Sequence, residues 1–366
     1  MQNLGLYLHI PFCREKCAYC DFYSLAADAE TQGHYAEALM RDLSRRAAEA
    51  EDLTVDTVYF GGGTPTVLGA ERLSELLTHI RRAYRISPDA EITFEANPES
   101  ARDSGSLRLL RDAGFNRVSL GVQSGDDGEL RRIGRIHTRA DVCTAVGAIR
   151  QAGFRNLSLD LMYALPEQTP ERWADNLAFA LSLAPEHLSC YALTLEEGTR
   201  LYRERASHRF PDDDEAADDY LFAVDTLARH GYRQYEISNF SREGFESRHN
   251  LRYWHLLPYL GFGPGAAGDF AGVRYAYARD LNAYCRGDCP YSEVTPISEA
   301  ERKREAVMLG LRLTEGVDTA AFPAVAAALR PYAAHGFTRE AEGRIALTPK
   351  GFLISNRLIA EALEAL

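Results

Sequence analysis

The spacing of three cysteines near the N-terminus constrains this chain more than any other feature. Cys13, Cys17 and Cys20 follow a short apolar run in the pattern Cys-x3-Cys-x2-Cys. Three thiolates are one too few for a closed tetrahedral zinc site. They are also one too few to ligate every iron of a four-iron cluster, so a cluster held here leaves one iron open to a non-protein ligand. Unrelated thiols or a zinc knuckle with a distant fourth ligand are the alternatives, but no Cys-x2-Cys pair or histidine with zinc spacing follows.

Composition and charge are those of a globular protein in a reducing compartment. The 366 residues are 46% hydrophobic and 26% charged, which suits one large and one small domain. The net charge of −12 argues against nucleic acid as a partner, because phosphate binding needs a basic face. The N-terminus has no basic region of a signal peptide and no stretch approaches about 18 apolar residues, so we expect a cytoplasmic protein. Cys285 and Cys289 lie close together without a third ligand nearby, so no second metal site is expected.

Short apolar runs alternate with amphipathic runs, which predicts strand–helix units around a parallel sheet. A doubly wound sheet and a barrel both fit this alternation. The acidic run at 212–215 is expected to begin a helix rather than to bind a metal, since carboxylates are favourable at a helix N-terminus. The expected strands span 5–9, 57–60, 91–95, 117–121, 156–161, 187–192 and 233–237, and the expected helices span 34–50, 69–83, 104–113, 139–152, 170–183 and 213–230.

Unusual residues come at or just after the ends of successive expected strands. The run Gly-Gly-Gly-Thr-Pro at 61–65 follows the second strand, and Glu95 closes the third. Gln123 follows the fourth, and Asp160 closes the fifth. The C-terminal rim of parallel strands is where (β/α) barrels build their sites. A glycine run after a strand lets backbone approach a ligand closely, although taken alone it also fits a tight turn.

Six motifs occur along the chain in the order in which one known family carries them. They are Tyr-Leu-His-Ile-Pro-Phe-Cys from residue 7, Gly-Gly-Gly-Thr-Pro from 61, Glu-Ala-Asn-Pro from 95, Gly-Val-Gln-Ser from 121, Gly-Arg-Ile-His-Thr from 134 and Asp-Leu-Met-Tyr-Ala-Leu-Pro from 160. Together they resemble the radical SAM superfamily and, within it, the oxygen-independent coproporphyrinogen III oxidase group, the HemN/HemW family. The resemblance implies an α/β fold: an incomplete (β/α)6 radical SAM barrel with a small, mainly helical, winged-helix-like C-terminal domain.

Carried over residue by residue, the resemblance implies a site for a [4Fe-4S] cluster and S-adenosylmethionine (SAM). Cys13, Cys17 and Cys20 would bind three irons, and SAM would chelate the fourth. Carboxylates suit an ammonium group and ribose hydroxyls, and a guanidinium suits a carboxylate. The same side chains also suit ordinary ion pairs at a barrel mouth. The residues implied to contact SAM are Tyr7, Tyr19, Gly62, Gly63, Thr64, Glu95, Gln123, Arg135 and Asp160.

Two departures separate this chain from the HemN-type dehydrogenases of that family. Their cluster motif continues to a fourth cysteine two positions after the third, where this chain has Phe22. They also carry a longer N-terminal extension, whereas this chain begins twelve residues before Cys13. Both departures are features of the HemW branch, whose members are described as heme chaperones.

A motif late in the chain favours the same branch. Residues 249–254 contain His-Asn-x-x-Tyr-Trp, which resembles a motif of the HemW branch. Imidazole is a good axial ligand for heme iron, and Tyr and Trp offer flat apolar area to a porphyrin. A buried histidine in an aromatic core is the alternative. The resemblance therefore implies heme contacts by His249, Asn250, Tyr253 and Trp254.

The expected organisation has three parts. A barrel domain over 1–240 carries the cluster and SAM site, a segment over 241–295 connects, and a HemN-type domain covers 296–366. We expect a heme chaperone, monomeric or weakly dimeric, that passes heme to acceptor apoproteins; membrane-associated respiratory proteins are candidates, and contact with the inner face of the membrane is left open. The alternative is an oxygen-independent coproporphyrinogen III dehydrogenase that makes protoporphyrinogen IX by radical SAM chemistry.

Overall fold

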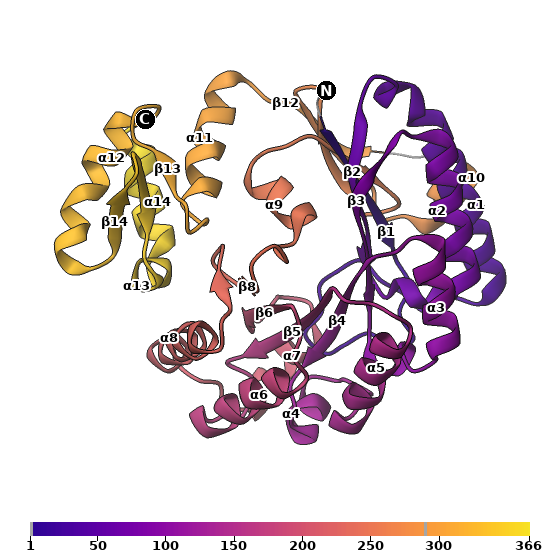
Figure 1. Cartoon of the computed structure of the whole chain (residues 1–366), viewed down its shortest axis with the longest axis horizontal. Coiled ribbons are helices and arrows are strands. Elements are labelled where there is room, and N and C mark those ends of the chain that lie inside the picture. The colour runs from indigo at the N-terminus through magenta and orange to yellow at the C-terminus, as the bar shows by residue number, and fades with distance from the viewer. Residues whose placement is uncertain (1–2, 289–290) are drawn as a thin grey trace.

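Six parallel strands, β1 to β6, lie side by side in sequence order within one twelve-stranded sheet (Figure 1). The computed structural model describes residues 3–288 and 291–366, so Cys289 lies outside the described residues. Every neighbouring pair among these six strands is parallel, which confirms the parallel core expected from the strand–helix alternation. The strands are β1 Asn3–Ile10, β2 Thr54–Gly62, β3 Ile86–Ala96, β4 Arg117–Gln123, β5 Leu157–Tyr163 and β6 His187–Ala192.

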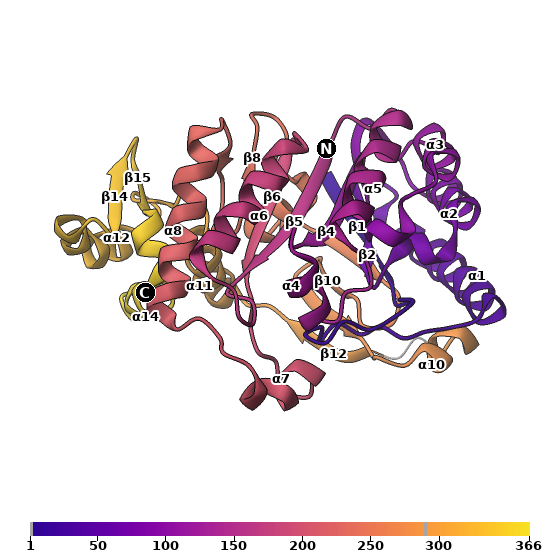
Figure 2. The same cartoon turned by 90° about the horizontal axis from the view of Figure 1, so that it is seen from below.

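Alternation along β1 shows how the sheet separates an apolar outer face from a polar inner face. Leu4, Leu6 and Leu8 are fully buried in the main hydrophobic cluster. Tyr7 and His9 have the opposite phase, point to the other face and hydrogen-bond to each other. Figures 1 and 2 place the larger helices along the outer side of the sheet. The helices between the strands are α1 Ala29–Arg46, α2 Ala70–Ala83, α3 Ser104–Ala113, α4 Asp127–Arg132, α5 Arg139–Gln151, α6 Pro170–Ser182, α7 Arg200–Glu204 and α8 Asp213–Arg229.

Local capping sets the helix boundaries. The Asp212 side chain accepts a hydrogen bond from the Glu215 backbone N–H, so the acidic run at 212–215 begins helix α8, as expected. Helix α3 ends at Gly114, whose φ of 110° is in the region that favours glycine. These short-range contacts explain why five of the six expected helices begin and end within one residue of the observed ones. The expected helix over 34–50 was less accurate: α1 begins five residues earlier, after the capping Asp28, and ends at Arg46, where a 3-10 turn over 47–50 follows.

The two edges of the sheet differ from the expected repeat. The expected seventh strand over 233–237 is only β7, Arg233–Gln234, and it runs antiparallel to β8, Asn239–Ser241. It stops there because the backbone of residues 235–237 hydrogen-bonds to residues 312–314 of the C-terminal part. At the other edge, residues 259–296 add four strands beside β1, so most of the expected connecting segment belongs to the sheet. These elements are β9 Tyr259–Phe262, β10 Ala267–Phe270, β11 Val273–Tyr277, α10 Leu281–Arg286 and β12 Tyr291–Pro296.

Helix α9, Arg248–Trp254, packs against the inner face of the sheet near the starts of β1, β2 and β3. The Glu91 carboxylate of β3 accepts hydrogen bonds from the first two backbone N–H groups of the helix, at 3.1 and 3.0 Å. Arg252 of α9 is 2% exposed and occupies the space beside Gly5 of β1. Helix α9 therefore lies inside the barrel at the end away from the cysteines.

The C-terminal part is a small helical domain with its own sheet, at one end of the molecule in both views (Figures 1 and 2). Its three strands are antiparallel in the order β13-β15-β14. This arrangement agrees with the mainly helical, winged-helix-like domain that was expected. Among the described residues, no helix has the length and apolar character needed to cross a membrane. The elements are α11 Glu299–Gly310, β13 Val317–Asp318, α12 Pro323–Leu329, β14 Thr338–Ala341, β15 Arg344–Leu347, α13 Pro349–Leu353 and α14 Ser355–Glu364.

Candidate functional site

The three cysteines lie on the loop that follows β1, at the C-terminal rim of the parallel strands. The loop is anchored by backbone hydrogen bonds: Cys13 donates to the Leu25 oxygen at 3.1 Å, and Ala18 donates to the Ile133 oxygen at 2.9 Å. None of the three thiols is in a disulfide bond, and all three are partly buried. Burial raises the pKa of the Cys20 thiol. The fold thus holds three partly buried thiols on a loop whose backbone is fixed.

The glycine run at 61–65 packs directly against the beginning of the cysteine loop. A Cβ on Gly63 would lie 2.6 Å from the Phe12 oxygen and 2.7 Å from the Ile10 oxygen, so only glycine fits there. The next residue, Thr64, donates its backbone N–H to the Phe12 oxygen at 2.7 Å. Its hydroxyl lies 3.5 Å from Cys13 Sγ. The glycine run was expected to let the backbone come close to a ligand. In the structure, the backbone of Gly63 and Thr64 comes close to the cysteine loop.

The two loops and the inner face of the sheet surround one cavity of about 570 Å³. All of the residues expected to hold the cluster and SAM line this cavity, except Tyr7. The Tyr7 hydroxyl pairs with His9 Nδ1 at 3.1 Å, and its ring stacks on Tyr59, which does line the cavity. The expected residues that line the cavity are Cys13, Cys17, Tyr19, Cys20, Gly62, Gly63, Thr64, Glu95, Gln123, Arg135 and Asp160.

Glu95 presents a carboxyl group to the cavity from the end of β3. It accepts hydrogen bonds from the Tyr59 hydroxyl at 2.8 Å and from the Gly62 backbone N–H at 3.0 Å. Burial raises the pKa of Glu95 to about 7, and these two hydrogen bonds oppose the rise. The carboxyl group therefore changes charge near neutral pH, where it can bind a cation in its ionised form.

Asp160 of β5 is surrounded by serine hydroxyls that the sequence analysis did not single out. Its carboxylate accepts hydrogen bonds from Ser189 at 2.7 Å, Ser119 at 3.0 Å and Ser158 at 3.4 Å. Burial raises the pKa of Asp160, and the serine hydroxyls oppose the rise. The sequence does contain a sign of this cluster, because the three serines recur at inward positions of three successive strands.

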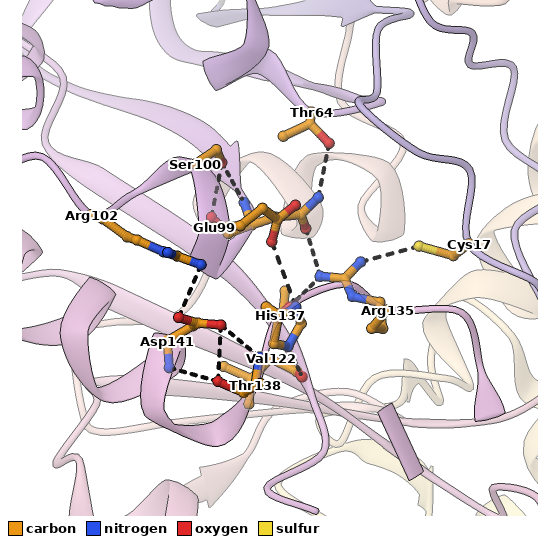
Figure 3. Close-up of polar contacts among 12 residues, drawn as sticks. Cys17, Thr64, Glu99, Ser100, Arg102, Val122, Arg135, His137, Thr138 and Asp141 are labelled. Atoms are coloured by element: carbon orange, nitrogen blue, oxygen red, sulfur yellow. Dashed lines mark hydrogen bonds and ion pairs between the residues drawn. The ribbon is translucent and has the colours of Figure 1, made fainter. Parts of the chain in front are cut away.

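Arg135 lies between the cysteine loop and the strand ends (Figure 3). One guanidinium nitrogen, Nη2, donates to the Asn97 Oδ1 atom at 2.7 Å and to the Gly121 oxygen at 2.6 Å. The other, Nη1, donates to Cys17 Sγ at 3.4 Å. Buried Arg135 Nε has no partner among the described residues. The guanidinium is thus largely engaged by the protein, and Asn97, which sequence reasoning missed, is one of its holders.

Gln123 reaches the cavity through an unusual backbone turn. Its φ of 64° is in the left-handed region, which is uncommon for a residue other than glycine. The pairing of β4 with β5 shifts register between Gly121 and Gln123. Strained backbone of this kind persists where the surrounding structure holds it, and here it aims an amide side chain at the cavity.

The His-Asn-x-x-Tyr-Trp motif forms most of helix α9, and its members differ in accessibility. His249 is 1% exposed; its Nδ1 lies 2.9 Å from the Thr57 hydroxyl and its Nε2 lies 2.8 Å from the Tyr253 hydroxyl. Burial lowers the pKa of His249 to about 3, so the ring is neutral. Asn250 lines the cavity, and Trp254 is half-buried. His249 is therefore surrounded as a buried histidine in an aromatic core would be, which was the alternative to a heme contact.

Comparison with known proteins identifies the family. The model of the Radical SAM superfamily matches residues 7–180, and that of the HemN C-terminal domain matches residues 297–354. A Bacillus subtilis protein named heme chaperone HemW is 35% identical, over 98% of this chain and 98% of its own length. This chain belongs to the HemW family.

Further relatives support this membership. Heme chaperone HemW of Synechocystis is 39% identical over 87% of this chain and 80% of its own, and that of Escherichia coli is 40% identical over 72% and 70%. The solved structure of coproporphyrinogen III oxidase (HemN) from Escherichia coli, a radical SAM enzyme, covers 100% of this chain and 91% of that chain with a TM-score of 0.86. At 24% sequence identity, this likeness shows the fold alone.

Membership of the HemW family and the radical SAM superfamily implies a four-iron cluster and SAM, and the residues present fit both. No group of three metal-ligating side chains surrounds a single position among the described residues. A cluster does not require one, because each thiolate binds a different iron. Phe22, at the position of the dehydrogenases' fourth cysteine, lines the same cavity and is 68% exposed. The loop therefore offers three thiols, and a four-iron cluster held by them has one iron without a protein ligand.

Proposed function

We propose that this chain is a heme chaperone, which binds heme together with a [4Fe-4S] cluster and SAM and passes the heme to acceptor apoproteins. The observation that carries this proposal is the 35% identity to the heme chaperone HemW of Bacillus subtilis, which spans 98% of both chains. The cavity supports it, because the three thiols and all the expected SAM contacts except Tyr7 line it.

In this proposal, Cys13, Cys17 and Cys20 bind three irons. Glu95 suits the ammonium group of SAM, since its carboxylate faces the cavity, and Asp160 suits the ribose hydroxyls, since three serines fix its orientation. When both are bound, the chemistry available at this site would be transfer of an electron to the sulfonium of SAM. The remaining proposed SAM contacts are Tyr19, Gly62, Gly63, Thr64, Gln123 and Arg135 from the cavity wall, with Tyr7 supporting them through the ring of Tyr59.

We place the heme contacts of the His-Asn-x-x-Tyr-Trp motif on Asn250, Tyr253 and Trp254 rather than on His249. Iron binding through either nitrogen of His249 would cost a hydrogen bond to Thr57 or to Tyr253 in a buried site. The other three residues are only half-buried and keep surface for a ligand. His249 is, in this view, a structural residue that links α9 to β2.

The proposed partners are heme and heme-accepting apoproteins, with membrane-associated respiratory proteins among the candidates. We propose a cytoplasmic location, with contact at the inner face of the membrane during transfer, and a monomer or weak dimer. The net charge of −12 supports the absence of a nucleic-acid partner, because it provides no general attraction to phosphates.

The cluster assignment is tested by Cys17→Ala. Loss of one of three thiolates is expected to abolish the visible absorbance of the cluster and its iron, because too few ligands remain. Cys143→Ala is the matched control, since Cys143 is an exposed thiol of α5. Iron analysis after anaerobic reconstitution provides the measurement, and about four irons per chain in Cys17→Ala would rule out the assignment.

The heme function is tested by titrating heme into the reconstituted protein and following its absorbance. We compare the wild type with His249→Gln, which keeps a hydrogen-bonding side chain, and with His255→Ala, which removes the exposed histidine directly after α9. Stoichiometric binding that survives His249→Gln is expected. If His249→Gln abolishes binding while the protein stays folded, His249 is the iron ligand and our placement of the heme contacts is wrong.

The same preparations are assayed with coproporphyrinogen III, SAM and a reductant. A chaperone is expected to yield no protoporphyrinogen IX. Formation of that product without specific heme binding would replace this proposal with the dehydrogenase alternative.

A further inference from the structure

Two of the three cluster cysteines are joined by a continuous chain of side-chain contacts. The Thr64 hydroxyl lies 3.5 Å from Cys13 Sγ, and Arg135 Nη1 donates to Cys17 Sγ at 3.4 Å. Asn97 connects the two: its Nδ2 donates to Thr64 Oγ1 at 2.9 Å, and its Oδ1 accepts from Arg135 Nη2 at 2.7 Å. Figure 3 labels Thr64, Arg135 and Cys17 along this chain of contacts.

Asn97 is held firmly enough to set the direction of these contacts. It follows β3, and its backbone N–H donates to the Ser100 hydroxyl at 3.1 Å, which donates back to the Asn97 oxygen at 2.8 Å. Arg135 has only donors, so the amide must present its oxygen to the guanidinium and its N–H group to Thr64. The opposite orientation would set donor against donor. The amide is therefore locked in one orientation.

That orientation leaves the Thr64 hydrogen free for Cys13, because a thiolate on Cys13 can only accept. A hydroxyl carries one hydrogen and two lone pairs. Because Thr64 Oγ1 already accepts a hydrogen from Asn97 Nδ2, its own hydrogen is free to donate to Cys13 Sγ. Each end of the chain of contacts thus directs a donor at a cluster thiol, a hydroxyl at Cys13 and a guanidinium at Cys17.

We propose that Asn97 is a positioning residue for the iron–sulfur cluster, which raises the cluster's reduction potential by directing Thr64 and Arg135 as donors to two of its thiolates. The inference rests on the cluster of the proposed function. Hydrogen bonds to cluster sulfurs are among the factors that set reduction potentials, since they stabilise the more negative, reduced state. Side chains beyond the direct ligands commonly tune a metal centre in this way.

The first test compares three threonine variants in the reconstituted full chain without SAM, by redox titration followed by electron paramagnetic resonance. Thr64→Val removes the hydroxyl but keeps the shape, so a lower reduction potential is expected. Thr64→Ser keeps the hydroxyl and is expected to restore the wild-type potential. Thr93→Val is the matched control, because Thr93 is fully buried in β3 and its hydroxyl has no partner among the described residues.

The second test addresses Asn97 itself. In Asn97→Asp, the carboxylate has no hydrogen to give, so the Thr64 hydroxyl must donate to it and turns away from Cys13; the potential is expected to fall. Part of that fall comes from the added charge. The shift should therefore be smaller when Asn97→Asp is made in the Thr64→Val background, because no hydroxyl remains to be redirected. Asn97→Ser removes the amide without adding charge, and the same direction is expected.

The outcomes separate this inference from the proposed function. Variants that load about four irons but have the wild-type potential would overturn the role of Asn97 while leaving the cluster in place. Equal shifts in Thr64→Val and Thr93→Val, or fully additive shifts in the double variant, would also overturn it. A wild-type chain that loads no cluster would instead refute the proposed function.

Discussion

Glu95 is the residue whose charge state should matter most to ligand binding. Its pKa of about 7 means that the carboxyl group is half ionised near neutral pH. A carboxyl group whose pKa is higher in the folded chain than in the unfolded one destabilises the fold as it ionises. Its neutral form is therefore preferred in the free protein at mildly acidic pH, and a bound cation must favour the ionised form.

We expect SAM affinity to rise about tenfold between pH 6 and pH 8, because Glu95 ionises over this range and pairs with the ammonium group only when charged. Glu95→Gln should bind SAM weakly at both pH values, with little pH dependence. Equilibrium dialysis of SAM against the reconstituted protein gives both affinities. Glu99→Gln is the control, because Glu99 lies near the site but does not line the cavity.

Ionisation of Glu95 should have the opposite effect on the stability of the fold. Since its folded pKa is raised, Glu95 costs stability increasingly as the pH rises from its unfolded pKa to about 7, and the cost is nearly constant above that. Glu95→Gln should therefore raise the unfolding midpoint in urea at pH 8 and change it little at pH 5. An equal change at both pH values would mean that Glu95 is not titrating in this range.

At the scale of elements, the position of helix α9 depends on a glycine in β1, Gly5, which has no side chain. A Cβ on Gly5 would lie 2.5 Å from Arg252 Cδ. Arg252 cannot move away easily, because it pairs with Asp56 and donates to the Pro258 oxygen at 3.0 Å. Glycine at this position is therefore required for α9 to sit inside the barrel.

We expect Gly5→Ala to lower the free energy of unfolding by roughly 1–3 kcal/mol, as overpacking in a buried site does. Gly33→Ala is the matched control. Gly33 lies within α1, and a Cβ there would have its nearest neighbour at 3.7 Å, so this change should stabilise by roughly 0.5–1 kcal/mol. Urea unfolding of both variants measures the difference, and equal effects would contradict the role given to Gly5.

The elements also show what sequence could and could not foresee. Strands such as 187–192 and helices such as 104–113 were predicted with their observed bounds, because alternation and capping are short-range properties. The predicted seventh strand over 233–237 was wrong in length, since the partners of residues 235–237 lie in the C-terminal domain, far along the chain. Strand β9 was missed because it is only four residues long and runs into the glycine-rich stretch 261–268, and its partners β1 and β10 are not visible in the local sequence.

The site shows the same division. The cysteines and the glycine run were found because each is a continuous motif with its own spacing. Asn97 was inside a recognised motif but had no assigned role, because its importance lies in partners at Thr64 and Arg135, which come from other loops. The two ring nitrogens of His249 are also occupied by partners from separate elements, Thr57 of β2 and Tyr253 of α9. The sequence suggested a buried histidine as an alternative but could not identify these partners.

At the scale of the whole molecule, a group of ion pairs ties the C-terminal domain to the sheet. Asp269 of β10 accepts two hydrogen bonds from Arg302 of α11, both at 2.8 Å. Arg274 of β11 pairs with Glu305 of α11 at 2.7 Å. Burial tends to raise the pKa of Asp269, but hydrogen bonds from Arg302 and Arg274 hold it below its usual value.

We expect Arg302→Gln to weaken this junction by roughly 1 kcal/mol, seen as faster hydrogen exchange of the α11 amides. Because the pKa of Asp269 is lowered in the folded state, the contribution is present at neutral pH and is lost as the pH falls through that value. Arg357→Gln is the control, since it breaks an exposed pair with Glu361 within α14 and should change little. Equal exchange in both variants would exclude the junction as a source of stability.

The position of β1 has a consequence for how the protein is made. The first strand of the chain ends up between β2 and β9, and Gly5 pairs with Tyr259. During synthesis, β1 and the cysteine loop leave the ribosome long before β9, so one side of β1 stays unpaired until β9 has emerged. The nascent chain therefore carries an open strand edge beside the three cysteines until residues 259–262 have been made, and the cluster of the proposed function would be loaded only after that point.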